Sequence, residues 1–561
     1  MTASINVIRG RFCYNNRMQI EGKTQKKQGG NATIEVHKLL ALLAEKDHLI
    51  DQQNQLLQAH QKHLTDKEQL IGEQQQYIAL IEEQLRLSII RKFAASSEKL
   101  SYQADLFDEV ELEVALSELN EQLPDDDKTT PEQNKQAKKR QRGFSDKLPR
   151  VQIHLTLSDE EKKGAISTFF SKVKEELEFI PAKVNVIEYW QEKAVFKQAG
   201  ENKLVAAQRP VHPLGKCFAS PSLLAYIITS KYADGLPLYR LSGMFKRYGA
   251  NVSRTNMANW VIRLDDVFKP LINLMKEEQL NSNYLQADET RIQVLKETGK
   301  VATSDKWMWV IRGGPPDKPV VLFDYDASRA GSVAERLLEG YEGVLQADGY
   351  SGYSVVCRRN NITRIGCWDH SRRKFVEAIK AAKPDKTKQR KGQLGKADVA
   401  LSKIRKLYAV EKKIQDQSAD EKKQMRETHS LPILEDLKSW LMKNHPRVLK
   451  GSLTEKAISY TLNQWEYLIG YCNDGHLNIS NALAENAIRP FAVGRRAWLF
   501  ADTAHGARAS ATCYSLVESA KANEVEPDVY LLHVINNIAT ADTVEKLEAL
   551  LPWNVKATLL S

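Results

Sequence analysis

Three acidic residues stand where a chain could hold two divalent metal ions. Asp288 and Asp348 each end a short apolar run, at 284–288 and 343–348. Such runs predict buried strands that end in a carboxylate. Glu485 comes much later, within a helical pattern. Phosphodiester transfer needs an activated oxygen nucleophile and a stabilised leaving oxygen, and two divalent ions about 3.5–4 Å apart supply both.

The residue types predict magnesium as the cofactor, two ions per site, with manganese as a substitute. Magnesium takes oxygen ligands, so carboxylates suit it and cysteine does not, and we expect no cysteine beside the acids. Adjacent strand ends would set Asp288 and Asp348 side by side, and a helix crossing the sheet edge would bring Glu485 to them. Three carboxylates repel one another without metal, so we expect metal to order the site.

Other interpretations of the acids stay open. A single aspartate at a strand end is usually a turn residue or a cap. A helical glutamate followed by arginines is often a salt-bridged surface residue. Further aspartates on or near predicted strand ends compete for the same role: Asp324, Asp326 and Asp369.

Basic residues near the acids are candidates for contacting DNA phosphates. One group follows the last predicted strand, and another follows Glu485. The alternative is a cationic helix surface with no ligand. The candidates are His370, Arg372, Arg373, Lys374, Arg489, Arg495 and Arg496.

The chain's bulk properties are consistent with a large intracellular protein. Its 561 residues are 42% hydrophobic, which allows several domains. A formal net charge of +10 fits a polyanionic partner but also occurs in many ordinary proteins. None of the six cysteines forms a CxxC pair, so we expect neither a disulfide scaffold nor structural zinc. No bilayer-spanning run or signal peptide is evident, which predicts a cytoplasmic protein without a membrane partner.

The elements around the aspartates follow a recognisable order. Three strands, a helix, a strand, a helix and a strand are the order of an RNase H-like core. The predicted strands are 282–295, 306–313, 319–325, 343–348 and 362–368, and the helices lie near 331–339 and 351–358. Residues 376–475 read as a helical insertion into this core, which resumes at 476–561.

Two helical regions precede the core. Apolar residues repeat every seven positions through 34–92, which predicts a coiled coil and a homo-oligomer. The alternative is a long helix packed on its own chain. Residues 221–268 predict three helices, the third capped by Ser253, in a helix-turn-helix pattern. Arg254 and Asn256 would lie at its DNA-reading end, although a plain helical hairpin fits equally well.

Several motifs resemble the insertion-sequence-66 family of bacterial transposases. They are 219–225, 236–240, 287–290, 345–353, 366–375, 481–490, 494–500 and the Leu-Pro-Trp-Asn near the C-terminus. The resemblance runs from about residue 34 to the C-terminus.

This resemblance implies a DDE transposase with an RNase H-like core. It assigns the catalytic and metal-binding acids to Asp288, Asp348 and Glu485. It also implies that the protein acts on element-end inverted repeats and target DNA, near the nucleoid, with accessory proteins of the same element as potential partners. A catalytically silent DNA-binding regulator, or another RNase H-like nuclease, remains the alternative.

The chain departs from the family pattern at two points. Family members usually carry a CxxC-type zinc module where this chain has 151–205, a segment without cysteine, so we expect no zinc there. Within this segment, Val184, Val186, Ile187 and Tyr189 predict a strand. Asp369 stands where a small residue is usual.

The predicted fold is therefore multidomain α plus α/β. The expected parts are a disordered N-terminus (1–33), a coiled-coil helix (34–104), a charged linker (105–150), a small zinc-free module (151–210), a helix-turn-helix-like domain (211–279), the first part of the core (280–375), the insertion (376–475) and the second part of the core (476–561).

Overall fold

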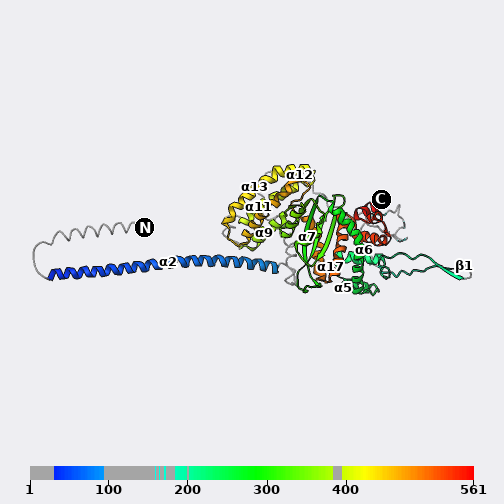
Figure 1. Cartoon of the computed structure of the whole chain (residues 1–561), viewed down its shortest axis with the longest axis horizontal. Helices are drawn as coiled ribbons and strands as arrows, with labels where there is room; N and C mark the ends of the chain where they lie inside the picture. The colour runs from blue at the N-terminus through cyan, green and yellow to red at the C-terminus, as the bar shows by residue number, and fades with distance from the viewer. Residues whose placement is uncertain are drawn as a thin grey trace. The chain divides into compact units, whose positions relative to one another are not determined.

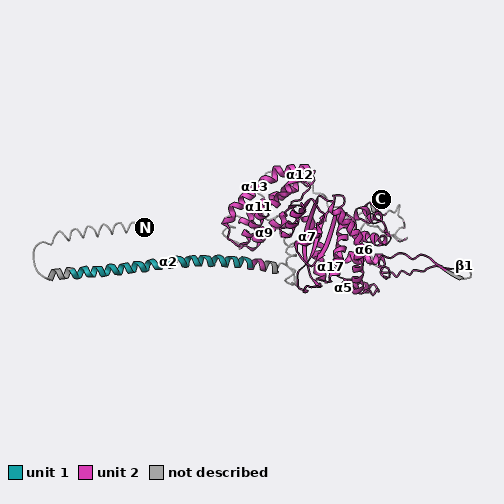
Figure 2. Ribbon diagram, viewed as in Figure 1, with its two compact units in different colours: residues 1–84 teal, residues 85–561 magenta. Residues whose placement is uncertain are grey.

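The computed structural model describes residues 31–93, 183–198, 201–382 and 395–560, with a few isolated positions between 158 and 171. The chain divides into two units, residues 1–84 and 85–561 (Figures 1 and 2). The described part is mostly helical, with a mixed β-sheet inside the second unit. None of its helices combines the length and the apolar character that crossing a bilayer requires. The predictions for 1–30, 94–157 and most of 158–182 fall outside the described residues.

Helix α2 (Asn31–Phe93) is one continuous element of 63 residues. Its heptad leucines and isoleucines are exposed where described, with Leu57 58%, Leu64 60% and Ile71 52% exposed. Isolated helices are only marginally stable in water without tertiary packing. Because the apolar stripe of α2 is exposed, the helix lacks, within this unit, the tertiary packing that normally stabilises a helix.

The central sheet has five strands in the order β6-β5-β3-β7-β8. β3 pairs antiparallel with β5, and β5 pairs antiparallel with β6. β3 pairs parallel with β7, and β7 with β8. The strands are β3 (Tyr284–Ile292), β5 (Lys306–Gly313), β6 (Val320–Asp326), β7 (Val344–Gln346) and β8 (Thr363–Ile365). The predicted order is confirmed except at 282–295, where the one expected strand is two. After β3 comes β4 (Val294–Lys296), which pairs outside this sheet with β9 (Ala501–Thr503).

Two hydrophobic cores cover the sheet. Helices α7 (Gly331–Leu337) and α8 (Ser351–Arg359) pack with Leu285, Trp309 and Leu345. Helices α16 (Ala482–Trp498) and α17 (Ala504–Ala522) pack with Met308, Val310 and Phe323. Successive strand residues point to opposite faces, so one strand serves both cores.

Three helices precede the sheet, as predicted. They are α4 (Pro221–Tyr232), α5 (Leu238–Arg247) and α6 (Arg254–Leu280). The Ser253 hydroxyl accepts a hydrogen bond from the Asn256 N–H at 3.1 Å, which satisfies a donor at the start of α6. α6 runs past the predicted end at 268 because Phe268, Leu271 and Met275 continue its buried face. These residues and the C-terminal helices share one core with the sheet.

A second helical group is inserted between β8 and α16. Its helices gather around α9 (Trp368–Ala381) (Figure 1). The described ones share a hydrophobic core of their own. They are α11 (Lys396–Ile414), α12 (Ala419–Met425), a π-helical turn (Arg426–Ser430), α13 (Leu431–Asn444), α14 (Leu453–Asn463) and α15 (Trp465–Leu468).

The small module before α4 differs from its prediction. The strand expected through Val184 and Tyr189 is wrong, because residues 183–192 have no regular secondary structure. The strands are instead β1 (Lys193–Gln198) and β2 (Glu201–Ala206), which pair antiparallel. A β-strand needs a partner for its backbone N–H and C=O groups, and the later segment has one.

Candidate active site

The first candidate aspartate, Asp288, lies on β3, and the second, Asp348, lies two residues after the end of its parallel neighbour β7. The β3–β7 ladder pairs Leu285 with Leu345 and Gln286 with Gln346. The ladder ends at this last pair, and the same register extended by two residues would set Asp288 opposite Asp348. Both carboxylates act electrostatically on the buried Tyr353 hydroxyl, which agrees with their closeness. The backbone holds each of them, since Asp288 Oδ1 accepts from Glu289 N and Asp348 Oδ1 from Tyr350 N, both at 2.9 Å.

Glu485 reaches the same region from the first turn of α16. Its Oε1 lies 3.5 Å from His370 Nδ1, and its Oε2 lies 3.4 Å from Arg373 Nη2. His370 and Arg373 are one turn apart on α9 and therefore share a helix face. His370 also lies within the electrostatic influence of Asp348, which links the second acid to the third.

His370 is half-buried against these charges, with 18% of its side chain exposed. Burial, and then the neighbouring Arg373, lower the pKa of His370 to about 4. The imidazole is therefore neutral near pH 7 and offers no positive charge to a phosphate. Its Nδ1 has no hydrogen-bond partner, although it faces Glu485.

A cysteine lies beside the third acid. Cys367 Sγ is 3.9 Å from Glu485 Oε1, so the expectation that no cysteine would stand near the acids is wrong. The spacing of residues in the sequence could not show this contact, because Cys367 and Glu485 are far apart in the chain and meet only through tertiary packing. Burial raises the pKa of the Cys367 thiol well above its ordinary value, and the thiolate is the form that binds metal.

The donor set fits a hard divalent cation. All three acids offer carboxylate oxygens, the ligands that magnesium and manganese take. A soft or borderline ion would instead prefer Cys367, His370 and Glu485, whose donor atoms lie within 4.8 Å of one another.

Arg329 and Glu289 belong to the site but were missed by the sequence interpretation. Arg329 Nε donates to Glu289 Oε1 at 2.9 Å, and the Glu289 side chain is only 1% exposed. Burial, followed by the charge of Asp348, raises the pKa of Glu289. The Arg329 guanidinium lies 4.6 Å from the Trp307 ring and 4.2 Å from the Tyr350 ring. Its Nη2 is 3.8 Å from Asp348 Oδ2, so it partly balances the acid's charge.

Removing this arginine should destabilise the protein. We expect Arg329→Met to cost about 2–3 kcal/mol of unfolding free energy, less than the roughly 3–5 kcal/mol for breaking a fully buried ion pair, because Arg329 is 36% exposed. Urea unfolding of the purified variant measures this. Adding Glu289→Gln should recover part of the loss, since the uncompensated carboxylate is then gone. Equal losses in the single and double variants would contradict the buried-charge explanation.

The inserted helices also contact the site. Arg364 Nη2 donates to the Asp348 carbonyl at 2.5 Å and to Gln464 Oε1 at 3.0 Å. Gly349 packs against the ring of Tyr460, on α14, and a β-carbon there would lie 3.0 Å from the ring, so the ring would have to shift. The insertion therefore supports the turn that follows Asp348.

Asp369 is held by the insertion rather than directed at the other acids. The Tyr408 hydroxyl, on α11, donates to Asp369 Oδ1 at 2.5 Å. Arg372 Nη1 lies 4.0 Å from the same oxygen. Asp369 therefore has a structural partner, which accounts for an acid at this position.

The other competing aspartates are occupied as well. Arg336 Nη2 lies 2.8 Å from Asp324 Oδ1 and 3.2 Å from Asp326 Oδ2. Both aspartates lie on β6, which β5 separates from β3. They lie outside the group formed by the three candidate acids.

The candidate DNA-contacting residues differ in exposure. Arg254 and Arg496 are exposed, and Asn256, Arg372, Arg373, Lys374 and Arg489 are half-buried. Lys374 lies 4.6 Å from the Tyr460 ring. Arg495 is 4% exposed and donates to the Arg291 carbonyl, so it supports the fold and cannot reach DNA without rearrangement.

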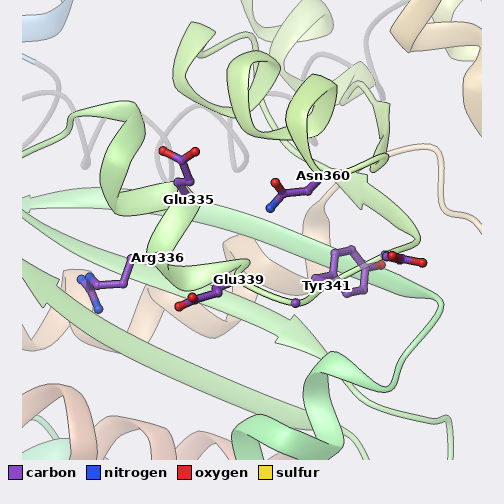
Figure 3. A pocket seen from close by; sticks show the side chains of 7 residues that line it. Glu335, Arg336, Glu339, Tyr341 and Asn360 are labelled. Atoms are coloured by element: carbon purple, nitrogen blue, oxygen red, sulfur yellow. The ribbon is translucent and has the colours of Figure 1, made fainter.

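A surface pocket of about 450 Å³ lies elsewhere, beside α7. Glu335, Arg336, Glu339, Tyr341 and Asn360 contribute to its lining, and their side chains point in different directions (Figure 3). None of the three candidate acids lines it. It offers no convergent set of catalytic groups.

Comparison with known proteins gives a consistent family. The family model "Transposase IS66 family" matches residues 216–509, and "IS66 C-terminal element" matches 515–553. A third model, "Transposase C of IS166 homeodomain", matches residues 80–153.

Relatives of similar length occur in Sinorhizobium fredii. The uncharacterized protein y4qI is 30% identical over 487 residues, covering 83% of this chain and 85% of that protein. The uncharacterized protein y4hP is 29% identical over 401 residues, covering 70% and 72%. With family models covering the sheet, the insertion and the C-terminal helices, the chain belongs to the IS66 family of transposases.

Proposed function

We propose that this protein is an active DNA transposase that binds the ends of its insertion sequence and catalyses DNA cleavage and strand transfer. The observation that supports the proposal is the parallel β3–β7 register, whose last pair, Gln286 and Gln346, stands two residues before Asp288 and Asp348. Glu485 lies in the first turn of α16. The strand order, with three antiparallel strands followed by two parallel ones, supports an RNase H-like core.

In this proposal Asp288, Asp348 and Glu485 hold two magnesium or manganese ions. Bound there, the ions would activate the attacking oxygen and stabilise the leaving oxygen. The chain's own residues prepare the site. Arg329 limits repulsion at Asp348, and Arg373 does the same at Glu485. Arg364 fixes the backbone at Asp348.

Incubation of the purified protein with labelled element-end DNA tests the function. Magnesium-dependent cleavage and joining to target DNA support the transposase. Binding without cleavage would support a regulator, which would need only a DNA-binding surface such as the exposed start of α6. Cleavage without joining would support another nuclease of the same fold.

The proposed DNA surface includes Arg254, at the first position of α6. We expect Arg254→Ala to flatten the plot of log affinity against log salt by about 0.9, the change for one lost phosphate contact. Filter binding or fluorescence anisotropy across a salt series measures the slope. The metal dependence of cleavage should not change.

Lys546→Ala is the matched control. Lys546 is exposed on another helix, where it pairs with Asp542 at 2.5 Å. An equal flattening in both variants would mean that net charge, rather than a contact at α6, governs binding. Unchanged affinity and slope in Arg254→Ala would identify α5 and α6 as a structural hairpin.

A further inference from the structure

Two buried glutamines stand two residues before the two aspartates. The strands repeat Leu-Gln-Ala-Asp, at 285–288 and at 345–348. The β3–β7 register sets Gln286 directly beside Gln346, and they are 2% and 0% exposed. Residues two apart on a strand share a face, so each glutamine lies on the face of the aspartate that follows it.

The glutamines connect the two strands to the segment that enters α16. Gln286 Nε2 donates to Gln346 Oε1 at 3.0 Å. Gln346 Nε2 donates to the Asn478 carbonyl at 2.8 Å and the Gly366 carbonyl at 2.9 Å. Gln286 Nε2 also reaches the Ser480 carbonyl at 3.3 Å. Buried polar groups rarely stay unpaired, so this network constrains all four segments.

Gln286 additionally caps α16. The Ala484 N–H, in the helix's first turn, donates to Gln286 Oε1 at 3.1 Å. Asn481 occupies the N-cap position, but its side chain makes no capping bond and donates instead to the Ala287 carbonyl at 3.3 Å. The first-turn N–H groups of a helix need outside acceptors. The sheet strand that carries the first acid thus supplies a second acceptor for this N–H, which also donates to the Asn481 carbonyl at 3.0 Å, immediately before Glu485.

We infer that Gln286 and Gln346 are positioning residues that set Glu485 against Asp288 and Asp348. The inference rests on the proposed function and adds residues that touch neither metal nor DNA. Groups that orient metal ligands typically affect metal affinity or activity by 10–100-fold. Loss of either glutamine should therefore weaken the site without removing any ligand.

The test uses the full-length variants Gln286→Met and Gln346→Met, which keep side-chain length but lose the amide. Manganese binding to the free protein, followed by electron paramagnetic resonance, should weaken by roughly 10–100-fold for the ion that Glu485 holds. The magnesium concentration that half-saturates cleavage should rise similarly, and high magnesium should restore the rate. A merely structural defect would lower activity at every magnesium concentration.

Gln279→Met is the matched control. Gln279 is an equally buried glutamine, 2% exposed. Its amide donates hydrogen bonds to the Ile311 and Val320 carbonyls, which are not next to the three acids in the chain. It should leave manganese binding unchanged. If Gln286→Met fails to fold, Gln346→Met decides alone, because it leaves the cap on Ala484 intact. Wild-type manganese binding in the folded glutamine variants overturns the inference, whereas a wild-type protein that neither binds manganese nor cleaves DNA overturns the proposed function.

Discussion

Asp348→Asn should reduce DNA cleavage and strand transfer by roughly a thousandfold or more, while binding of element ends persists. The substitution keeps an oxygen that can accept from Tyr350 N–H, so the turn should survive. It removes the negative charge that would hold the metal. Metal ions contribute several kcal/mol to transition-state stabilisation, and each 1.36 kcal/mol corresponds to tenfold in rate. Asp288→Asn and Glu485→Gln should behave alike.

Rates of cleavage and joining on labelled ends, with affinity measured in parallel, check this prediction. Asp324→Asn is the matched control, since Asp324 lies near the end of β6 but pairs with Arg336. It should retain near-normal rates. An acid whose variant cleaves normally does not belong to the site, and lost binding in all three variants would show that the acids support the fold or DNA contact instead.

Leu57→Pro combined with Leu64→Pro should lower the oligomeric state. We expect the heptad stripe of α2 to pack against the same stripe of a second copy, because burying a leucine contributes about 1.5–3 kcal/mol and these residues are exposed in one chain. Each proline costs a helix interior about 3 kcal/mol or more. Light scattering of the purified protein measures the change in mass.

A second set of variants separates the effect of losing the apolar stripe from the effect of breaking the helix. Leu57→Ala with Leu64→Ala keeps the helix and removes apolar surface, so it should also lower the mass. Lys62→Ala with Gln69→Ala changes the opposite face, by the 100° rotation per residue of an α-helix, and should leave the mass unchanged. An unchanged mass in both leucine pairs would mean that α2 does not drive association.

Local patterns in the sequence were sufficient to identify most elements of the core. The strand predicted at 306–313 is β5 with the same bounds, because an apolar run between turn residues specifies a buried strand. Ser253 was correctly identified as a cap, since capping depends on residues only three positions apart. The strand expected near Val184 was wrong because β-propensity carries no information about a pairing partner.

The candidate acids could be named from the sequence, but their surroundings could not. The β3–β7 pairing sets Gln286 beside Gln346, two residues before Asp288 and Asp348, and no local pattern specifies which strands are neighbours. The same holds for Cys367 beside Glu485, and for the burial of Arg495.

The sequence by itself determined the element types, the heptad stripe and the strand ends that carry acids, because these depend on periodicity within a few residues. Only the tertiary structure decided what holds those acids in place. Gln286, Arg329 and Arg364 act through partners distant in the chain. Their hydrogen bonds arise from packing of the sheet, α16 and the insertion, and side-chain contacts between distant segments exist only once those elements are packed.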